Sequence, residues 1–148
     1  MISPELLRRY PFFGSLSADQ LKQIAMMSDE VSLAAGVTIL EEGKPAQAIY
    51  LLMEGAVDVF FSVSENKEFF VAEINPGEAF GISAMVDPYT VTTSVRTSKT
   101  SRVIKISATE LRKACAEDSV LAAAVYQHIA KSAIERLDAT RVQLVAAR

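Results

Sequence analysis

The residues best suited to chemistry lie in one segment of the chain, residues 77–95, with the sequence GEAFGISAMVDPYTVTTSV. Gly77 and Gly81 let backbone N–H groups approach an oxyanion closely, and the hydroxyls of Thr92 and Thr93 donate further hydrogen bonds. A short apolar stretch between them suits one helical turn, whose N-terminus adds partial positive charge. The pattern predicts an anion-binding loop; the alternative is an ordinary strand connection with glycines at its turns.

Catalytic and metal-binding chemistry have few candidates elsewhere in the chain. His128 is the single histidine, whereas metal centres in β-barrel enzymes use two or three imidazoles and hydrolase triads place one beside a nucleophile. Glu41 and Glu42 are adjacent, so their side chains diverge instead of forming an acid/base pair. Cys115 has apolar helical neighbours that favour packing in a core. We therefore predict no enzyme activity and no metal site.

The composition limits which classes of partner and which cellular compartment we expect. The 148 residues are 50% hydrophobic and carry 15 basic and 18 acidic side chains, a net charge of -3 that disfavours nucleic-acid backbones and anionic membranes. No window reaches the roughly 18 apolar residues of a membrane span, and no signal peptide opens the chain. With one cysteine and no internal disulfide, we expect a single soluble, cytoplasmic domain over 1–148.

Three regions with different periodicity follow one another along the chain. Helices are predicted over 3–28, where Pro11 ends the first and Ser17 with Gln20 forms a capping box for the second. Short β-rich runs separated by turn glycines occupy 30–106, which is typical of a sandwich, roll or barrel. The helical period returns over 108–147, with a break expected near residues 117–119. These regions predict a mainly β fold with helices at both ends.

The last helix carries a periodic stripe at alternating steps of four and three. This spacing is the seam along which two helices pack together, and it favours a homodimer or docking onto an output domain. The alternative interpretation is that the stripe only packs against the barrel. The stripe consists of Tyr126, Ala130, Ala133, Leu137, Thr140 and Leu144.

Three stretches together resemble the cyclic-nucleotide-binding domain family, the sensor module of the catabolite activator protein and of cyclic-nucleotide-regulated kinases and channels. They are YPFFGSLSADQLKQIA, then GVTILEEGKPAQAIYLLMEGAVDVF, then PGEAFGISAM followed by VTTSV. The resemblance extends from about Tyr10 to Leu144. It implies a jelly-roll β-barrel of about eight strands, a phosphate-binding cassette in the third stretch, and a long C-terminal helix that reaches the base. The glycine and apolar positions of the second stretch that match the family are Gly36, Ile39, Gly43, Tyr50, Gly55 and Val57.

The resemblance assigns ligand-binding roles to individual positions, with cAMP or cGMP as the implied ligand and no other cofactor. Two positions differ from the family. Ile82 stands where the family has the glutamate that holds the ribose, and Val91 stands where it has the arginine that pairs with the phosphate. A shift of one or two residues in register would place Thr90 or Tyr89 there instead, and none of the three is basic. The absence of this glutamate and this arginine predicts that a cyclic nucleotide binds more weakly by roughly two to four decades, unless Arg96 or Arg141 reaches the anion from elsewhere. The matching cassette positions are Gly77, Phe80, Gly81, Ser83, Ala84, Thr92 and Thr93, and the base-side candidates are Thr140 and Arg141.

Two functions follow from this resemblance. In the first, a cyclic nucleotide or another small ligand closes the cassette and moves the C-terminal helix. In the second, the domain no longer binds nucleotide and acts as a protein-interaction or dimerisation scaffold. Direct DNA binding is not expected, because the sequence ends at Arg148 without a helix-turn-helix.

Overall fold

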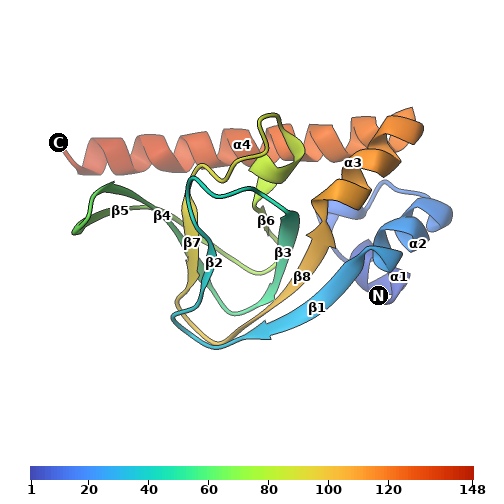
Figure 1. Cartoon of the computed structure of the whole chain (residues 1–148), viewed down its shortest axis with the longest axis horizontal. Helices are drawn as coiled ribbons and strands as arrows, with labels where there is room; N and C mark the ends of the chain where they lie inside the picture. Colours follow the sequence, from blue (N-terminus) through green and yellow to red (C-terminus); the bar gives the residue numbers. More distant parts are fainter.

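Eight β-strands form two antiparallel sheets of four strands, and helices lie at one end and along one side of them (Figure 1). The computed structural model describes all 148 residues. The strand orders are β1-β8-β3-β6 and β2-β7-β4-β5. The strands are β1 (Ser28–Leu33), β2 (Thr38–Leu40), β3 (Ala48–Glu54), β4 (Val57–Ser64), β5 (Lys67–Ile74), β6 (Ala79–Phe80), β7 (Ser94–Thr97) and β8 (Ser101–Ser107).

The centre of the first sheet is apolar on both faces. Every residue of β3 from Ala48 to Leu52 is buried, and Leu51 is paired with Ile104 of β8. A strand that is buried on both faces reads as a continuous apolar run instead of an alternating one. Helix α3 (Ala108–Glu117) packs against both β3 and β8, which explains the second buried face.

The N-terminal helices close one end of the barrel. They are α1 (Pro4–Arg8), a 3-10 turn η1 (Pro11–Phe13) and α2 (Ala18–Met26). The predicted capping box is present: the Gln20 N–H donates to Ser17 Oγ at 3.1 Å, and the Ser17 N–H donates to Gln20 Oε1 at 2.9 Å. Phe13 and Leu21 are fully buried, so these helices share the core of the barrel.

Asp118 separates the two C-terminal helices, α3 and α4 (Ser119–Ala146). Its Oδ1 accepts from the N–H groups of Val120 at 3.0 Å and Leu121 at 3.1 Å, which caps α4. Its Oδ2 accepts from Gln20 Nε2 of α2 at 3.1 Å. The break predicted near residues 117–119 is therefore confirmed, and its cap also ties α4 to the N-terminal helices.

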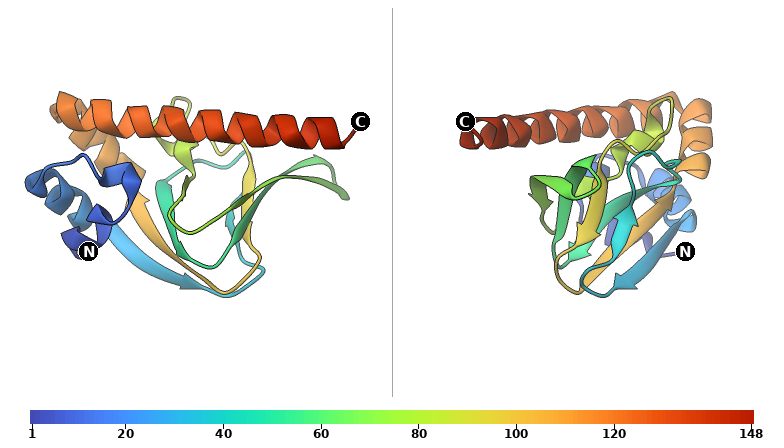
Figure 2. Two further views of the ribbon diagram at one scale, coloured as in Figure 1. Left: turned by 180° about the vertical axis from the view of Figure 1, so that it is seen from behind. Right: turned by 60° about the vertical axis from the view of Figure 1, so that its left-hand side comes forward.

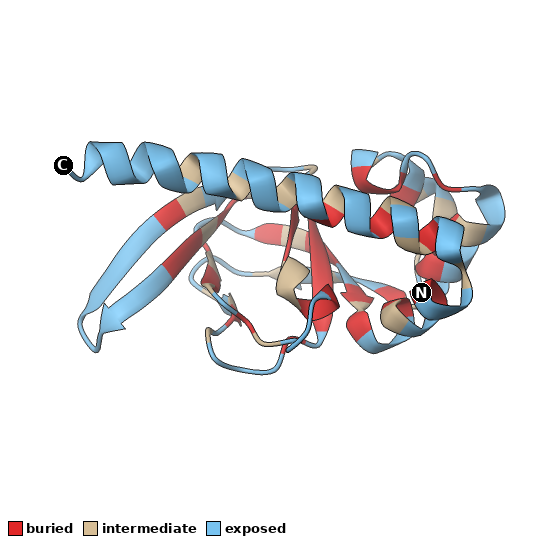
Figure 3. Ribbon diagram, turned by 90° about the horizontal axis from the view of Figure 1, so that it is seen from above, coloured by how far each residue is buried: buried red, intermediate tan, exposed pale blue.

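Helix α4 runs along the barrel and continues beside the β4–β5 hairpin (Figure 2). Its buried residues are Leu121, Val125 and Ile129, one turn apart, and beyond Ile129 no residue of the helix is buried (Figure 3). None of the helices combines the length and the apolar character that crossing a bilayer requires. The predicted mainly β jelly roll with N-terminal helices and a long C-terminal helix is confirmed.

Candidate functional site

A cavity of about 410 Å³ lies between the predicted cassette and α4. Its volume is within the range of about 300–1,000 Å³ that is usual for small-molecule sites. One wall comes from the segment between β6 and β7, including the 3-10 turn η2 (Ile82–Met85), and the opposite wall comes from α4. The lining residues are Leu40, Gly81, Ile82, Ser83, Val86, Thr92, Thr93, Val95, Ile129, Ala133, Arg136, Leu137 and Thr140.

Six of the sequence-predicted ligand positions line this cavity. They are Gly81, Ile82, Ser83, Thr92 and Thr93 on the barrel side and Thr140 on α4. The hydroxyls of Ser83, Thr92 and Thr93 take part in no hydrogen bond within the chain, whereas the Thr140 hydroxyl donates to the Arg136 carbonyl at 2.9 Å. The barrel wall therefore offers three hydroxyl groups to a ligand.

Gly81 is required at the start of η2 by its backbone and by its neighbours. Its φ of 74° lies in the left-handed region that side chains with a Cβ seldom adopt. A Cβ here would lie 3.2 Å from the Ala48 carbonyl oxygen, 3.2 Å from Leu40 Cδ1 and 3.3 Å from Tyr50 Cδ2. The glycine thus allows the cavity wall to pack directly against β2 and β3.

Several other cassette positions lie behind the cavity instead of lining it. Phe80 is fully buried and stacks on Tyr50 with ring centroids 5.1 Å apart, and Ala84 is also fully buried. Gly77 lies away from this cavity, and its N–H donates to the Leu52 carbonyl at 2.8 Å. These residues shape the frame of the cassette, because their packing and backbone bonds hold it against β3.

Val91, which the family resemblance places at the position of a phosphate-binding arginine, packs into the core. It is only 4% exposed and is absent from the cavity wall. Its N–H donates to the Lys44 carbonyl at 2.9 Å, and its carbonyl accepts from the Gly43 N–H at 2.8 Å. Ile82, in contrast, does face the cavity and makes that part of its wall apolar.

Arg96 and Arg141, the two predicted substitute anchors, have other partners. Arg96 pairs with Glu68 at 3.1 Å and lies over the Phe60 ring at 4.3 Å. Arg141 is 69% exposed, pairs with Asp138 at 3.6 Å and does not line the cavity. Neither guanidinium is free to face a ligand there.

Arg136 is the charged residue of the cavity, and sequence reasoning missed it. It is half-buried and takes part in no ion pair and no side-chain hydrogen bond. Burial lowers the pKa of its guanidinium below the ordinary value, and the charges of Glu78 and Glu135 partly oppose this effect. Its position one turn before Thr140 was the available signal, but only the docking of α4 shows that this face meets the cavity.

Two side chains from the C-terminal helices bond to η2. Arg112 of α3 donates through a guanidinium nitrogen to the Ala84 carbonyl at 2.5 Å, and the Tyr126 hydroxyl of α4 donates to the Met85 carbonyl at 3.0 Å. Arg112 also lies over the Tyr89 ring at 4.1 Å. The last carbonyls of η2 are thereby satisfied from both helices, which links the cavity wall mechanically to α3 and α4.

The predicted helix seam lies along the edge of the cavity. Ala133, Leu137 and Thr140 line the cavity, and the Tyr126 hydroxyl contacts η2. The same stripe is also exposed, since Leu137 is 50% and Leu144 is 67% accessible, and Ala130 is exposed as well. The stripe therefore borders both the cavity and the surface.

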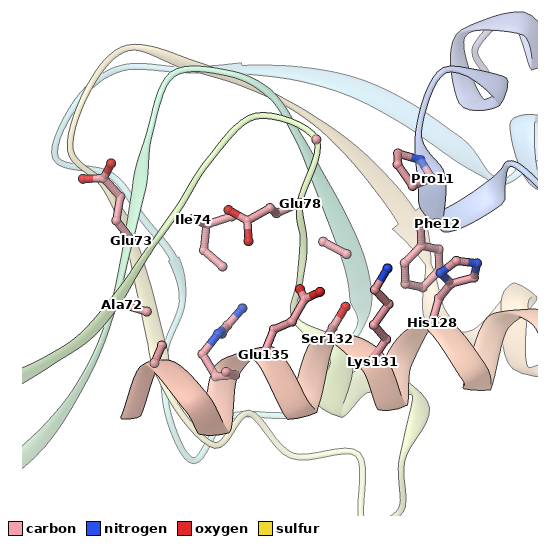
Figure 4. A pocket seen from close by; sticks show the side chains of 14 residues that line it. Pro11, Phe12, Ala72, Glu73, Ile74, Glu78, His128, Lys131, Ser132 and Glu135 are labelled. Carbon is pink, nitrogen blue, oxygen red and sulfur yellow. The ribbon is translucent and has the colours of Figure 1, made fainter. Parts of the chain in front are cut away.

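A second, more polar groove of about 260 Å³ lies beside α4 (Figure 4). Arg136 lines not only the cavity but also this groove. Glu78 from the β5–β6 loop and Lys131 and Glu135 from α4 project into it. His128 is partly exposed and packs on Phe12 with ring centroids 5.3 Å apart. No group of three or more histidine, cysteine, aspartate or glutamate side chains is arranged to hold a metal ion.

Residues 30–118 match the family of the cyclic nucleotide-binding domain, and the chain belongs to that family. Among curated relatives, the cAMP-dependent protein kinase regulatory subunit of Emericella nidulans is 32% identical over 100 residues, which cover 68% of this chain and 24% of that protein. The CRP-like cAMP-activated global transcriptional regulator of Mycobacterium tuberculosis is 23% identical over 108 residues, or 73% of this chain and 48% of that one. The chain thus spans less than half the length of these relatives.

Solved structures give the same fold. A candidate cyclic nucleotide-binding protein from Geobacter metallireducens is 38% identical, with a TM-score of 0.85 and coverage of 93% of this chain and 99% of that one. The sensor domain of the transcriptional regulator DNR from Pseudomonas aeruginosa has a TM-score of 0.75 at 24% identity, and 90% of each chain is covered.

Proposed function

We propose that this chain is a non-enzymatic, ligand-sensing regulatory module that binds a small molecule between the cassette and α4 and transmits its occupancy through α4. The observation that carries the proposal is the cavity itself, whose opposite walls belong to the cassette and to α4. A ligand that contacts both walls shifts the population of any arrangement in which they are differently spaced. The bonds from Arg112 and Tyr126 to η2 provide the route by which such a shift reaches the helices.

A cyclic nucleotide is the first ligand to test, since family membership and the relatives named for cAMP support it. The apolar Ile82 in the wall and the buried Val91 remove two interactions that the family resemblance implies. Each charge-assisted bond contributes about 1.5–3 kcal/mol, so the expected dissociation constant moves from the micromolar toward the millimolar range.

Calorimetry and thermal unfolding with cAMP and cGMP test the nucleotide version. At a dissociation constant of about 1 mM, ligand at about 10 mM stabilises the folded state by about 1.4 kcal/mol, which raises Tm by about 3–6 °C. Ala133→Phe, which fills the cavity, should abolish the shift, whereas Ala130→Phe on the same exposed helix surface should preserve it. Absence of heat and of any Tm shift at this concentration would rule out cyclic nucleotides as the ligand.

A dimerisation scaffold is the second candidate function, and the exposed apolar stripe on α4 favours it. Leu144 is 67% exposed and lies in the predicted seam without lining the cavity. Leu144→Asp should convert a dimer to a monomer in light scattering. Val142→Asp is the matched control, because Val142 is 66% exposed and two residues along a helix lie on nearly opposite faces. A wild-type monomer, or equal effects of the two variants, would refute this function.

A further inference from the structure

We propose that Arg136 is the anion anchor of the cavity, so that the natural ligand carries an acidic group that is held from α4 instead of from the cassette. This inference rests on the proposed function, because it assumes that a ligand enters the cavity. It adds the chemical class of that ligand, a small molecule with an apolar body and one phosphate, sulfonate or carboxylate group.

The charge of the cavity supports an anionic ligand. Arg136 is the single charged residue among the lining residues, and the rest of the wall is apolar or carries hydroxyls. Arg136 also lines the polar groove together with Glu78 and Glu135, whose charges influence it, but neither carboxylate lies within ion-pair distance. A ligand in the cavity therefore meets one positive charge that no ion pair within the chain neutralises.

Comparison with the other arginines shows that the missing partner is unusual. Three further arginines are of intermediate burial, and each has its guanidinium engaged. Arg96 pairs with Glu68, Arg102 pairs with Glu30 and Glu54, and Arg112 donates to the Ala84 carbonyl. Arg136 is also of intermediate burial, yet it has no ion-pair or hydrogen-bond partner for its side chain in the chain. A half-buried guanidinium without a partner loses part of its hydration and forms no ion pair or hydrogen bond in exchange. A bound anion supplies that interaction.

The hydroxyls of the opposite wall complete an anion site. Ser83, Thr92 and Thr93 line the same cavity as Arg136, and their hydroxyls have no partner in the chain. An acidic group between the two walls accepts hydrogen bonds from the hydroxyls and the guanidinium together. Because the cation is on α4 and the hydroxyls are on the barrel, the acidic group bridges the two parts that the proposed function requires to move.

Two fluorescent probes with a shared aromatic body test this inference on the full chain. The first is 8-anilinonaphthalene-1-sulfonate, which is anionic, and the second is N-phenyl-1-naphthylamine, which lacks the sulfonate. We expect Arg136→Gln to weaken sulfonate binding by about 10- to 100-fold and to leave the neutral probe within about twofold. Arg136→Lys should retain part of the affinity, because a lysine keeps the charge without the planar fork.

The controls separate failure of this inference from failure of the proposed function. Arg141→Gln changes an exposed arginine on the same helix and should alter neither probe. Ala133→Phe should abolish binding of both probes. If Ala133→Phe abolishes binding but Arg136→Gln leaves sulfonate affinity unchanged, the anion anchor is wrong and the cavity remains a ligand site. If neither probe binds, or Ala133→Phe has no effect, both proposals fail.

Thermal unfolding distinguishes an arginine that anchors a ligand from one that stabilises the fold. Because the Arg136 guanidinium has no partner in the chain, Arg136→Gln should leave Tm unchanged or raise it. A Tm loss comparable to that of a core substitution would show that Arg136 serves the fold, and this outcome would overturn the inference.

Discussion

Replacing Arg112 with alanine tests the connection between η2 and the C-terminal helices. The substitution removes a charge-assisted hydrogen bond to the carbonyl of the buried Ala84, which contributes about 2 kcal/mol, and a cation–π contact with Tyr89, which contributes about 1 kcal/mol. We therefore expect the free energy of unfolding to fall by about 3 kcal/mol. For a domain of this length, that loss lowers Tm by about 6–12 °C.

Circular dichroism during heating and urea titration measures this loss, and two further variants apportion it. Arg141→Ala removes an exposed ion pair and should change the free energy of unfolding by less than about 0.5 kcal/mol. Tyr89→Leu removes the ring under Arg112 and should lose about 1 kcal/mol. In the Arg112→Ala background, the same Tyr89 substitution should lose measurably less, because the contact is already absent. If Arg112→Ala is no more destabilising than Arg141→Ala, η2 is not held by α3.

Three more perturbations have defined outcomes. Gly81→Ala should lower the free energy of unfolding by about 2 kcal/mol and Gly77→Ala by about 1 kcal/mol, because both have positive φ but only Gly81 is crowded; equal losses in urea titration would contradict this. Hydrogen bonds from the Leu121 N–H and then Gln20 lower the pKa of Asp118 below its ordinary value of 3.8, so its stabilisation is present above that pH and is lost as the pH falls below it. Asp118→Asn should therefore show a smaller acid-induced fall in Tm than the wild type, and parallel Tm curves would refute the assignment. Burial raises the pKa of the Cys115 thiol, so iodoacetamide should label it slowly in the native state and rapidly in urea, and fast native labelling would contradict its burial.

Local signals made most of the fold predictable from the sequence. The capping box of Ser17 and Gln20 depends on residues three apart, and it fixed the start of α2. The break at Asp118 was likewise visible in a short window of sequence. Family resemblance then supplied the jelly-roll topology, which local signals alone left open among several β architectures.

The residues that connect and charge the site were less predictable, because their contacts depend on how α4 packs against the barrel. The Arg112 and Tyr126 bonds to η2 join residues 28 and 41 positions apart, and nothing in the sequence marks them as partners. Arg136 and Arg141 look equivalent in the sequence, yet one lines the cavity and the other faces solvent. The difference arises from their angular positions on a helix whose orientation is set by contacts near Leu121 and Ile129.

Leu137 belongs both to the cavity wall and to the exposed stripe of α4, and this double position has a thermodynamic consequence. If a second molecule covers the stripe, the ligand and the partner share a boundary, so their binding free energies are not independent. Linkage then requires that whatever factor the ligand applies to the association constant, association applies to the ligand affinity. Ligand isotherms recorded at different protein concentrations would consequently fail to superimpose, and the direction of the displacement would report whether the ligand favours the paired or the separate state.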